Sequence, residues 1–365
     1  MESEPCWTVV IAAFNAEAHL PALIESIRDQ ETPTKETGPE ILLVDGRSSD
    51  GTVELARALG CRVIDNPAGD VRNAKLIGFQ AARSDKVSFV DQDERLVREN
   101  SLLLKAQLLD CRPSTVAVIC SGYAVHPSIS AARNYVSEFG DPVSALLYSL
   151  PNADGRREFA LKRRLNWQET EDGAVVFDNT IPSSRVLIEF GVQGGMVSQR
   201  RIRALLNTPS DEATPLLSIS ELFGQAKVTR SFFDIGFIPN DPVEHLPSTE
   251  WPVVFSKVRW RVSNSLDFSE GSIRNSGVRG RLAAQFGAKV KVLEISLVLL
   301  FTIYVLSLVP VLSHAVWISL TRRQAAMLMH VPLSFYVLLV SISFWVLRFF
   351  RKRPKDRRYD GTLFQ

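Results

Sequence analysis

Short apolar runs alternate with amphipathic stretches over the first hundred residues. The runs are rich in β-branched and aromatic residues, as buried strands are, and they lie at 7–13, 41–44, 62–64 and 86–90. The stretches between them place apolar residues at helical spacing, at 20–27, 52–59 and 71–82. Because strand and helix keep alternating, the pattern predicts an α/β fold built on a doubly wound, mostly parallel sheet.

Two longer apolar runs follow near the carboxyl terminus. Ile295–Leu312, which could continue to Trp317, and Ala325–Phe350 are each long enough for a membrane span of about 20 residues. Two buried core helices are the alternative, but runs this apolar leave no polar face for solvent. We therefore expect two transmembrane helices that form a hairpin.

Basic residues flank this hairpin unevenly. Several Lys and Arg residues lie at 274–291 and again at 348–358, whereas only Arg322 and Arg323 lie between the two runs. The positive-inside bias then puts both ends of the hairpin, with the globular region, in the cytoplasm of a multi-pass membrane protein. The basic tail is either drawn to anionic lipid or simply solvated.

Composition narrows the choice of function. The net charge of +2 does not indicate nucleic-acid binding. The four cysteines lack metal-ligand spacing and the density of a secreted scaffold, so we expect reduced thiols, as in a cytoplasmic domain.

Carboxylates follow two of the predicted strands. Asp45 comes after the second strand, and Asp91 and Asp93 come after the fourth. The carboxyl ends of parallel strands are where open α/β sheets bind ligands. A divalent cation could bridge such carboxylates to a nucleotide diphosphate, and Mg²⁺ or Mn²⁺ accepts these oxygen ligands. The sequence therefore predicts a metal and diphosphate site.

Four segments in this order resemble the signatures of family 2 glycosyltransferases. They are Val-Val-Ile-Ala-Ala-Phe-Asn-Ala-Glu at 9–17, Val-Asp-Gly-Arg-Ser-Ser-Asp-Gly-Thr at 44–52, Arg72-Asn73 with Gly78, and Asp91-Gln92-Asp93. The resemblance is dense over about 7–95 and implies a GT-A-like fold with a Rossmann-like donor half that binds a nucleotide sugar.

The resemblance also implies roles for single residues. Ala12, Phe14 and Glu17 would line the nucleoside pocket, Asp45 would bind the base, and Arg72 would contact base or phosphate. Asp91 would contact ribose or the metal, and Asp93 would bind the metal.

The acceptor side departs from the family pattern. A strand at 194–197 should precede a helix with an acidic general base, but no Glu-Asp pair follows it. The nearest candidates are Asp211-Glu212 and Glu221. We favour Glu221 as the base, or else it only caps or solvates a helix. A lipid phosphate acceptor is already ionised and needs no base, so the missing pair favours such an acceptor.

Three further features point to the diphosphate or to lipid. His245 resembles the histidine that the family places near the metal. Ser256 replaces the glutamine of a motif typical of processive synthases, although Arg259 and Trp260 match it, which disfavours processive synthesis. Arg259 and Arg261 hold the diphosphate, hold a lipid headgroup, or are juxtamembrane charges. The basic run at 156–164 is interpreted as an exposed helix face, with a contact to acceptor phosphate or the membrane surface as the alternative.

These features together predict a membrane-anchored, metal-dependent glycosyltransferase of cell-envelope glycan or glycolipid biosynthesis. It would move a sugar from a nucleotide-diphosphate donor to a polyprenyl phosphate or glycolipid, non-processively and, by family analogy, with inversion. A sugar nucleotidyltransferase and a non-catalytic membrane scaffold remain alternatives. The expected parts are a nucleotide-sugar-binding half (1–115), an acceptor-binding half (116–250), a juxtamembrane segment (251–291), the hairpin (292–350) and a basic tail (351–365).

Overall fold

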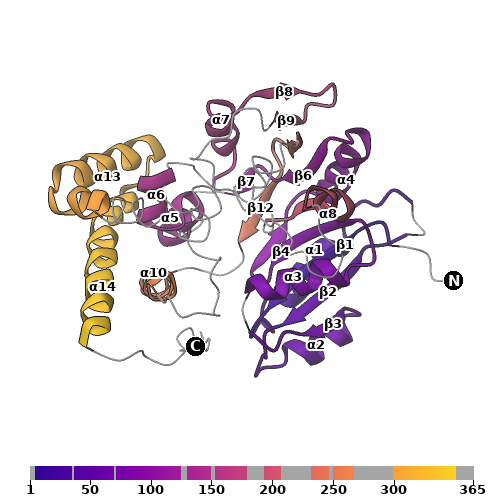
Figure 1. The fold of residues 1–365 in the computed structure, drawn as a ribbon, viewed down its shortest axis with the longest axis horizontal. Helices are drawn as coiled ribbons and strands as arrows, with labels where there is room; N and C mark the ends of the chain where they lie inside the picture. The colour runs from indigo at the N-terminus through magenta and orange to yellow at the C-terminus, as the bar shows by residue number, and fades with distance from the viewer. Residues whose placement is uncertain are drawn as a thin grey trace. The chain divides into compact units, whose positions relative to one another are not determined.

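The computed structural model describes most of the chain. The described residues are 5–34, 37–69, 71–124, 130–148, 153–178, 193–206, 232–245, 250–266 and 299–350. The chain divides into two compact units (Figure 1). Unit 1 comprises Met1–Ala124 and Ala153–Pro247, and unit 2 comprises Val125–Asn152 and Ser248–Gln365. Residues 125–152, which we expected in the acceptor half, thus group with the carboxyl-terminal helices.

The amino-terminal part of unit 1 is the predicted alternation of strands and helices. Its elements are β1 (Thr8–Ala13), α1 (Leu20–Arg28), β2 (Glu40–Asp45), α2 (Thr52–Ala58), β3 (Arg62–Asp65), α3 (Val71–Ala81) and β4 (Lys86–Asp91). The strands lie in the order β3-β2-β1-β4 and are all parallel. Ala13 lies opposite Asp45, and Ala12 lies opposite Asp91, so the two acidic strand ends flank the end of β1.

Helices cover both faces of these strands, as a doubly wound sheet requires. On one face, Val9 and Ile11 join a buried core that includes the apolar side of α1. On the other face, α3 contacts β1 at Gly78, where an added Cβ would lie 2.2 Å from a Val10 methyl. The glycine of the third signature therefore permits the close approach of α3 to the sheet.

The sheet continues with strands of both directions. The further elements are β6 (Thr115–Ile119), β8 (Trp167–Glu169), β9 (Val175–Asp178), β10 (Gly195–Ser198) and β11 (Asp234–Phe237), with α4 (Ser101–Cys111), α7 (Arg157–Lys162) and α8 (Gln199–Leu206). Within the described residues the sheet has nine strands, in the order β3-β2-β1-β4-β10-β6-β11-β9-β8. β10 runs antiparallel to both β4 and β6. Only β9 and β10 run opposite to the other described strands, so the sheet is mixed, with the remaining seven strands in one direction as predicted.

A second, small sheet lies beyond β4. It contains β5 (Glu94–Leu96), β12 (Pro242–His245) and β7 (Gly122–Tyr123), in the order β5-β12-β7. In it, His245 lies opposite Glu94. This pairing brings a histidine from late in the chain to the residues that follow Asp93.

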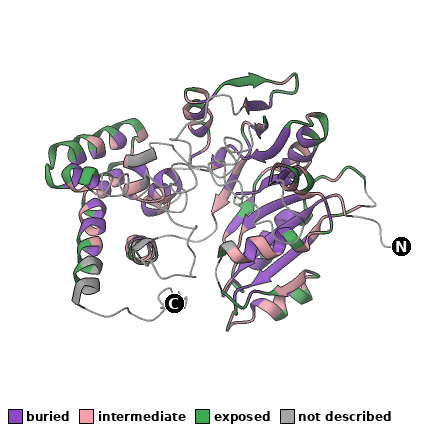
Figure 2. Ribbon diagram, in the orientation of Figure 1, coloured by how far each residue is buried: buried purple, intermediate pink, exposed green. Residues whose placement is uncertain are grey.

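Unit 2 is helical in its described residues. It contains α5 (Ala131–Phe139), α6 (Pro142–Tyr148), α10 (Trp251–Leu266), a helix at Leu299–Leu306, α13 (Val309–Arg322), the 3-10 helix η2 (Ala325–Met329) and α14 (His330–Phe350). Its buried core includes Tyr135, Val258, Val305, Ile318 and Leu333. Many apolar side chains of α13 are nevertheless exposed (Figure 2).

The two predicted spans differ in the structure. Ala325–Ser343 is one helix long and apolar enough to cross a membrane. The first apolar run is instead two helices, Leu299–Leu306 and Val309–Arg322, which meet at an angle of 79°. Leu308 has a positive φ of 59° at the break, and Pro310 lies in the first turn of α13. Proline lacks the N–H that would continue the preceding helix, so the first run is bent here, and two transmembrane helices are not confirmed.

Candidate donor and metal site

The carboxyl edge of the parallel strands begins with a turn built on Asp45. The buried Asp45 carboxylate accepts hydrogen bonds from the Arg47 N–H (3.0 Å), the Ser48 N–H (3.1 Å) and the Ser48 hydroxyl (2.6 Å). Arg47 has a positive φ of 69°, and these bonds stabilise that uncommon backbone shape. The predicted base-binding aspartate therefore shapes its own loop.

The loop after β1 is bonded to both neighbouring loops. The Gln92 side-chain amide accepts from the Phe14 N–H (2.6 Å) and donates to the Phe14 carbonyl (3.1 Å). The Glu17 carboxylate accepts from the Gly51 N–H (2.9 Å), just ahead of α2. Phe14 is half-buried and Glu17 is exposed. The middle residue of Asp91-Gln92-Asp93 thus positions the predicted nucleoside pocket.

Asp91 ends β4 beside a buried lysine. Lys75, from α3, places its Nζ 2.7 Å from Asp91 Oδ1, and its side chain is only 7% exposed against 31% for Asp91. Asp91 Oδ1 is buried without a partner in hydrogen-bond geometry among the described residues. The contact is therefore a short ion pair that holds the Asp91 carboxylate at the end of β4.

Asp93 lies beside His245, as the resemblance implied. The Asp93 Oδ2 to His245 Nε2 distance is 3.1 Å, with exposed fractions of 22% and 14%. The Tyr123 ring packs edge-on against the imidazole. The structure thus brings together two of the three predicted metal ligands from chain positions that are far apart.

Glu94, which directly follows this motif, is fully buried. Its carboxyl group accepts from the Asp91 N–H (2.9 Å), the Gln193 N–H (3.1 Å) and the Tyr123 hydroxyl (2.9 Å). Burial and the nearby charges of Asp91 and Asp93 raise the pKa of Glu94 to about 8. At neutral pH this group is therefore mostly protonated, and it fixes the backbone that carries the two aspartates.

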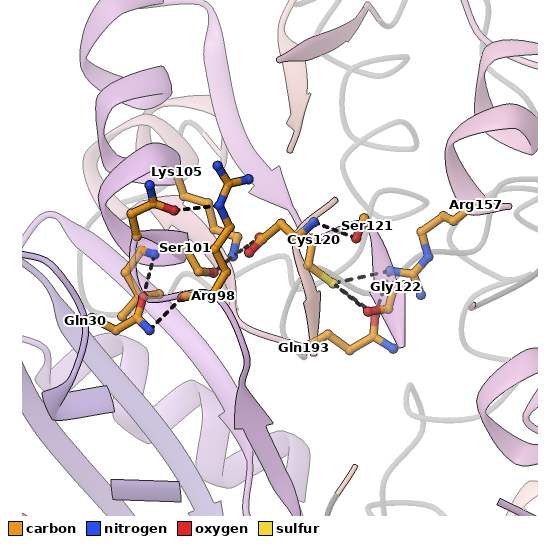
Figure 3. Close-up of polar contacts among 12 residues, drawn as sticks. Gln30, Arg98, Ser101, Lys105, Cys120, Ser121, Gly122, Arg157 and Gln193 are labelled. Carbon is orange, nitrogen blue, oxygen red and sulfur yellow. Dashed lines mark hydrogen bonds and ion pairs between the residues drawn. The ribbon is translucent and has the colours of Figure 1, made fainter. Parts of the chain in front are cut away.

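A buried polar network supports the residues behind this edge (Figure 3). Arg157 donates to the Gln193 side-chain carbonyl at 2.6 Å, and both contact the Cys120 sulfur. Gln193 and Gly194 both have a positive φ just before β10. Arg157 is only 2% exposed, so the interpretation of 156–164 as an exposed helix face is wrong for this residue. Its guanidinium instead fixes an uncommon turn.

The strand that carries His245 has its own buried support. Lys105 and Asp241 form an ion pair of 2.6 Å, with side chains 0% and 1% exposed. The Asp241 N–H also donates to the Ser121 hydroxyl (2.9 Å). Because Asp241 directly precedes β12, this ion pair connects the start of the histidine strand to α4.

The other predicted residues are distributed as follows. Ala12 is buried in β1. Arg72 lies in the first turn of α3, and its side chain lies outside the described residues, as does Glu221 altogether. Arg259 and Arg261 lie on α10 of unit 2, where Arg259 is exposed.

The acidic edge fits a hard divalent cation that it shares with a ligand. Among the described residues, no group of three or more His, Cys, Asp and Glu side chains could hold an ion alone. Mg²⁺ and Mn²⁺ need only one or two carboxylates when phosphate oxygens and water complete the shell. The partly exposed side chains of Asp91 and Asp93 offer such carboxylates at this edge. Two surface hollows at the opposite, amino ends of the strands contain neither aspartate.

Sequence reasoning missed Lys75, Gln92 and Glu94 as contributors to this edge. A signal existed for Glu94, because it directly follows two aspartates on a strand-to-strand turn. Lys75 lies three residues after Arg72 and one helical turn before Gly78, so helical spacing puts it on the sheet side of α3.

Comparisons with known proteins agree with this geometry. Residues 8–125 match the model of glycosyl transferase family 2. No match was found among curated proteins.

Solved structures with a similar course of the chain include S. aureus TarS, with 15% identity and a TM-score of 0.40 over 93% of this chain. This chain spans 54% of that TarS chain. A TarS 1-349 structure in complex with UDP has 13% identity and a TM-score of 0.40, covering 97% of this chain and 94% of that one. Mannosyltransferase PcManGT from Pyrobaculum calidifontis, in complex with GDP-Man and Mn²⁺, has 11% identity and a TM-score of 0.46. The match covers 94% of this chain and 88% of the PcManGT chain.

The matched family segment contains every part of the edge that comes before residue 125. It includes the Asp45 turn, Lys75 and the Asp91 to Glu94 segment. The match over residues 8–125 therefore indicates a glycosyltransferase domain of the family 2 type in this part of the chain.

Proposed function

We propose that this enzyme transfers a sugar from a nucleotide-diphosphate donor to a lipid-linked acceptor, a polyprenyl phosphate or a glycolipid, at a membrane surface. The observation that carries the proposal is the contact between Asp93 and His245, two residues after Asp91 ends β4. A nucleotide sugar needs a site for its base and ribose beside a site for its diphosphate, and the Asp45 turn adjoins this edge through β1.

The nucleoside would bind over the ends of β1 and β2. The loop at 14–17 is already bonded to the β2 loop and to Gln92, so it is organised before the donor arrives. Phe14 offers a half-buried ring to the base, and Asp45 and Arg72 are its proposed polar contacts.

The diphosphate would bind at Asp91 and Asp93. Asp91 and Asp93, with His245, would hold Mg²⁺ or Mn²⁺, which as a Lewis acid stabilises the departing diphosphate. Lys75 offsets part of the negative charge on Asp91. Glu94 keeps both aspartates in position without adding a third negative charge at neutral pH.

Whether the reaction needs a general base depends on the chemistry of the acceptor. Direct displacement by an acceptor oxygen inverts the anomeric carbon, and a hydroxyl acceptor must lose its proton in that step. Glu221 is the proposed base for a hydroxyl acceptor. A lipid phosphate needs none. Arg259 and Arg261, which lie on α10 of unit 2, are proposed contacts for the diphosphate or for a lipid headgroup.

A donor screen on purified protein with a lipid extract tests this function. The expected result is nucleotide release together with a glycolipid whose mass has increased by one sugar. Nucleotide release without a glycolipid would contradict the lipid acceptor. Calorimetry with UDP-hexose, with and without Mn²⁺, separates an enzyme from a non-catalytic scaffold, because a scaffold gives no metal-dependent heat.

A further inference from the structure

The corner between α13 and α14 is packed against an insertion of the catalytic chain. Arg322, at the end of α13, forms an ion pair with Glu138 of α5, whose side chain is 1% exposed. Tyr135 of α5 has its hydroxyl 2.8 Å from His330 Nδ1, at the start of α14. All of these contacts lie inside unit 2. The corner at 322–330 and α5 must therefore lie on the same side of any membrane.

Chain connectivity fixes which side that is. Unit 2 begins as residues 125–152, and both ends of this segment join unit 1, at Ala124 and at Ala153. A segment of 28 residues cannot cross a bilayer twice, because each crossing needs about 20 residues. It also contains Arg133, Glu138 and Asp141. The α5 helix, and the corner packed on it, therefore lie on the catalytic side.

Charge assigns the other end of α14 to that side as well, because the proposed nucleotide-sugar donor makes the catalytic side cytoplasmic. The sequence from Arg348 to Arg358 carries seven Lys and Arg residues, and such clusters stay on the cytoplasmic face. Between its ends, α14 packs against α10, with the Phe255 and Tyr336 rings 4.8 Å apart. Because α10 begins six residues after β12 ends, α10 also stays with the catalytic chain.

Within the described residues, the carboxyl-terminal helices expose many large apolar side chains. Ile303, Val309 and Leu320 are 64%, 70% and 72% exposed, and Leu339 on α14 is 64% exposed. Such a set of exposed large side chains is unusual for a surface that faces water. Helices of this kind can lie in the plane of one leaflet with the apolar face buried about 5–10 Å deep.

We infer that unit 2 enters a single leaflet of the bilayer from the catalytic side and returns, so that neither α13 nor α14 crosses the membrane. The occupant of the apolar face is the acyl-chain region of that leaflet. This arrangement places Arg322, Arg323 and the basic tail on one side, whereas a crossing hairpin would leave Arg322 and Arg323 on the far side. The inference rests on the membrane attachment in the proposed function.

Cysteine labelling distinguishes the two topologies. Ala325 is exposed at the corner, and Ala325→Cys is a small change there. Cys111 is exposed on unit 1 and serves as the native marker of the catalytic side. Burial raises the pKa of Cys6, of Cys120 and of Cys61, the last to about 11, so these thiols react slowly. Cys111→Ala gives the background, and the probes are Ala325→Cys and Gly361→Cys placed in that background.

The measurement uses a membrane-impermeant maleimide on right-side-out and inside-out vesicles. We expect both probes and Cys111 to react in the same vesicle orientation only. Reaction of Ala325→Cys in the opposite orientation would restore the crossing hairpin, and reaction of Gly361→Cys alone in the opposite orientation would indicate a single crossing by α14. A corner that reacts in neither orientation also contradicts the inference.

Sedimentation separates this inference from the proposed function. Protein in the soluble fraction would refute membrane attachment itself, and with it this topology. The protein could instead sediment with membranes and be active in the donor screen, while its labelling pattern indicates a crossing helix. That result would leave the proposed function intact and refute only the topology.

Discussion

Two aspartate sites at the same sheet edge are built in opposite ways. Asp45 is buried, and its carboxylate accepts hydrogen bonds from Arg47 and Ser48 of its own turn. The Asp91 side chain is 31% exposed beside Lys75, and the Asp93 side chain is 22% exposed next to a histidine. The first site stabilises a loop shape. The second retains ligand capacity, which a cation and a diphosphate can use.

The largest expected effect is at the site of Asp91 and Asp93. Asp93→Ala removes a proposed metal oxygen, and we expect turnover of labelled donor to fall by about a thousandfold or more, while the melting temperature changes little. Asp172→Ala, at an exposed turn between β8 and β9, is the matched control and should keep wild-type turnover. Full activity in Asp93→Ala would refute the assigned role.

Substitutions of Glu94 test what holds the backbone of Asp91 and Asp93 in place. Glu94→Ala leaves two buried N–H groups without acceptors and should lower the free energy of unfolding by about 2–4 kcal/mol. Glu94→Gln imitates the protonated carboxyl group and should be much milder. The measurement is urea unfolding of metal-free protein.

The pH dependence of the Glu94 comparison has a defined sign. Because the folded-state pKa is raised from 4.5 to about 8, wild type loses stability relative to Glu94→Gln as the pH rises across that interval. A difference that is constant from pH 5 to pH 9 would show that the carboxyl group is ionised in the folded protein.

Substitution of Asp45 should first affect the stability of its own turn. Asp45→Ala frees the Arg47 and Ser48 N–H groups in a strained turn, and we expect a loss of about 1–2 kcal/mol in the free energy of unfolding, with a raised KM for the donor. Asp45→Asn keeps one acceptor oxygen, so its free energy of unfolding and its KM should lie between those of wild type and Asp45→Ala. If Asp45→Ala changes KM without changing stability, the aspartate contacts the donor rather than shaping the loop.

The smallest expected effect concerns Lys75. Lys75→Met removes a positive charge beside Asp91, so Mn²⁺ should bind the donor-free protein about tenfold more tightly by calorimetry. Lys75→Arg keeps the charge and should leave the affinity near that of wild type. Weaker Mn²⁺ binding in Lys75→Met would indicate that the lysine organises the site rather than competing with the metal.

The sequence allowed the parallel strands and their acidic ends to be predicted almost residue by residue. Buried parallel strands are continuous apolar runs, and the residues after them necessarily meet at one edge, so Asp45, Asp91 and Asp93 could be placed without a structure. The position of His245 could be predicted only through the family resemblance, since β12 reaches Asp93 by a pairing of short strands that have little pattern.

Other features depend on contacts that local sequence patterns do not encode. Arg157 lies in a basic run that is typical of a solvated helix, yet it is buried because Gln193 accepts its hydrogen bond. The length of the first apolar run predicted a span, but Pro310 and the backbone at Leu308 divide it. The grouping of 125–152 with the carboxyl-terminal helices required the structure, because nothing in that segment's pattern identifies its partner.

The insertion of α5 and α6 matters for anyone who wants a water-soluble version of this enzyme. Ending the chain after α10 would remove Arg322 and His330 and so uncover Tyr135 and Glu138, which are nearly inaccessible in the intact protein. Such a truncation would replace one exposed apolar surface with another. It would also remove Arg322 from its ion pair with the buried Glu138. A soluble variant should therefore lose 125–152 together with the last helices, with a short glycine-rich bridge between Ala124 and Ala153.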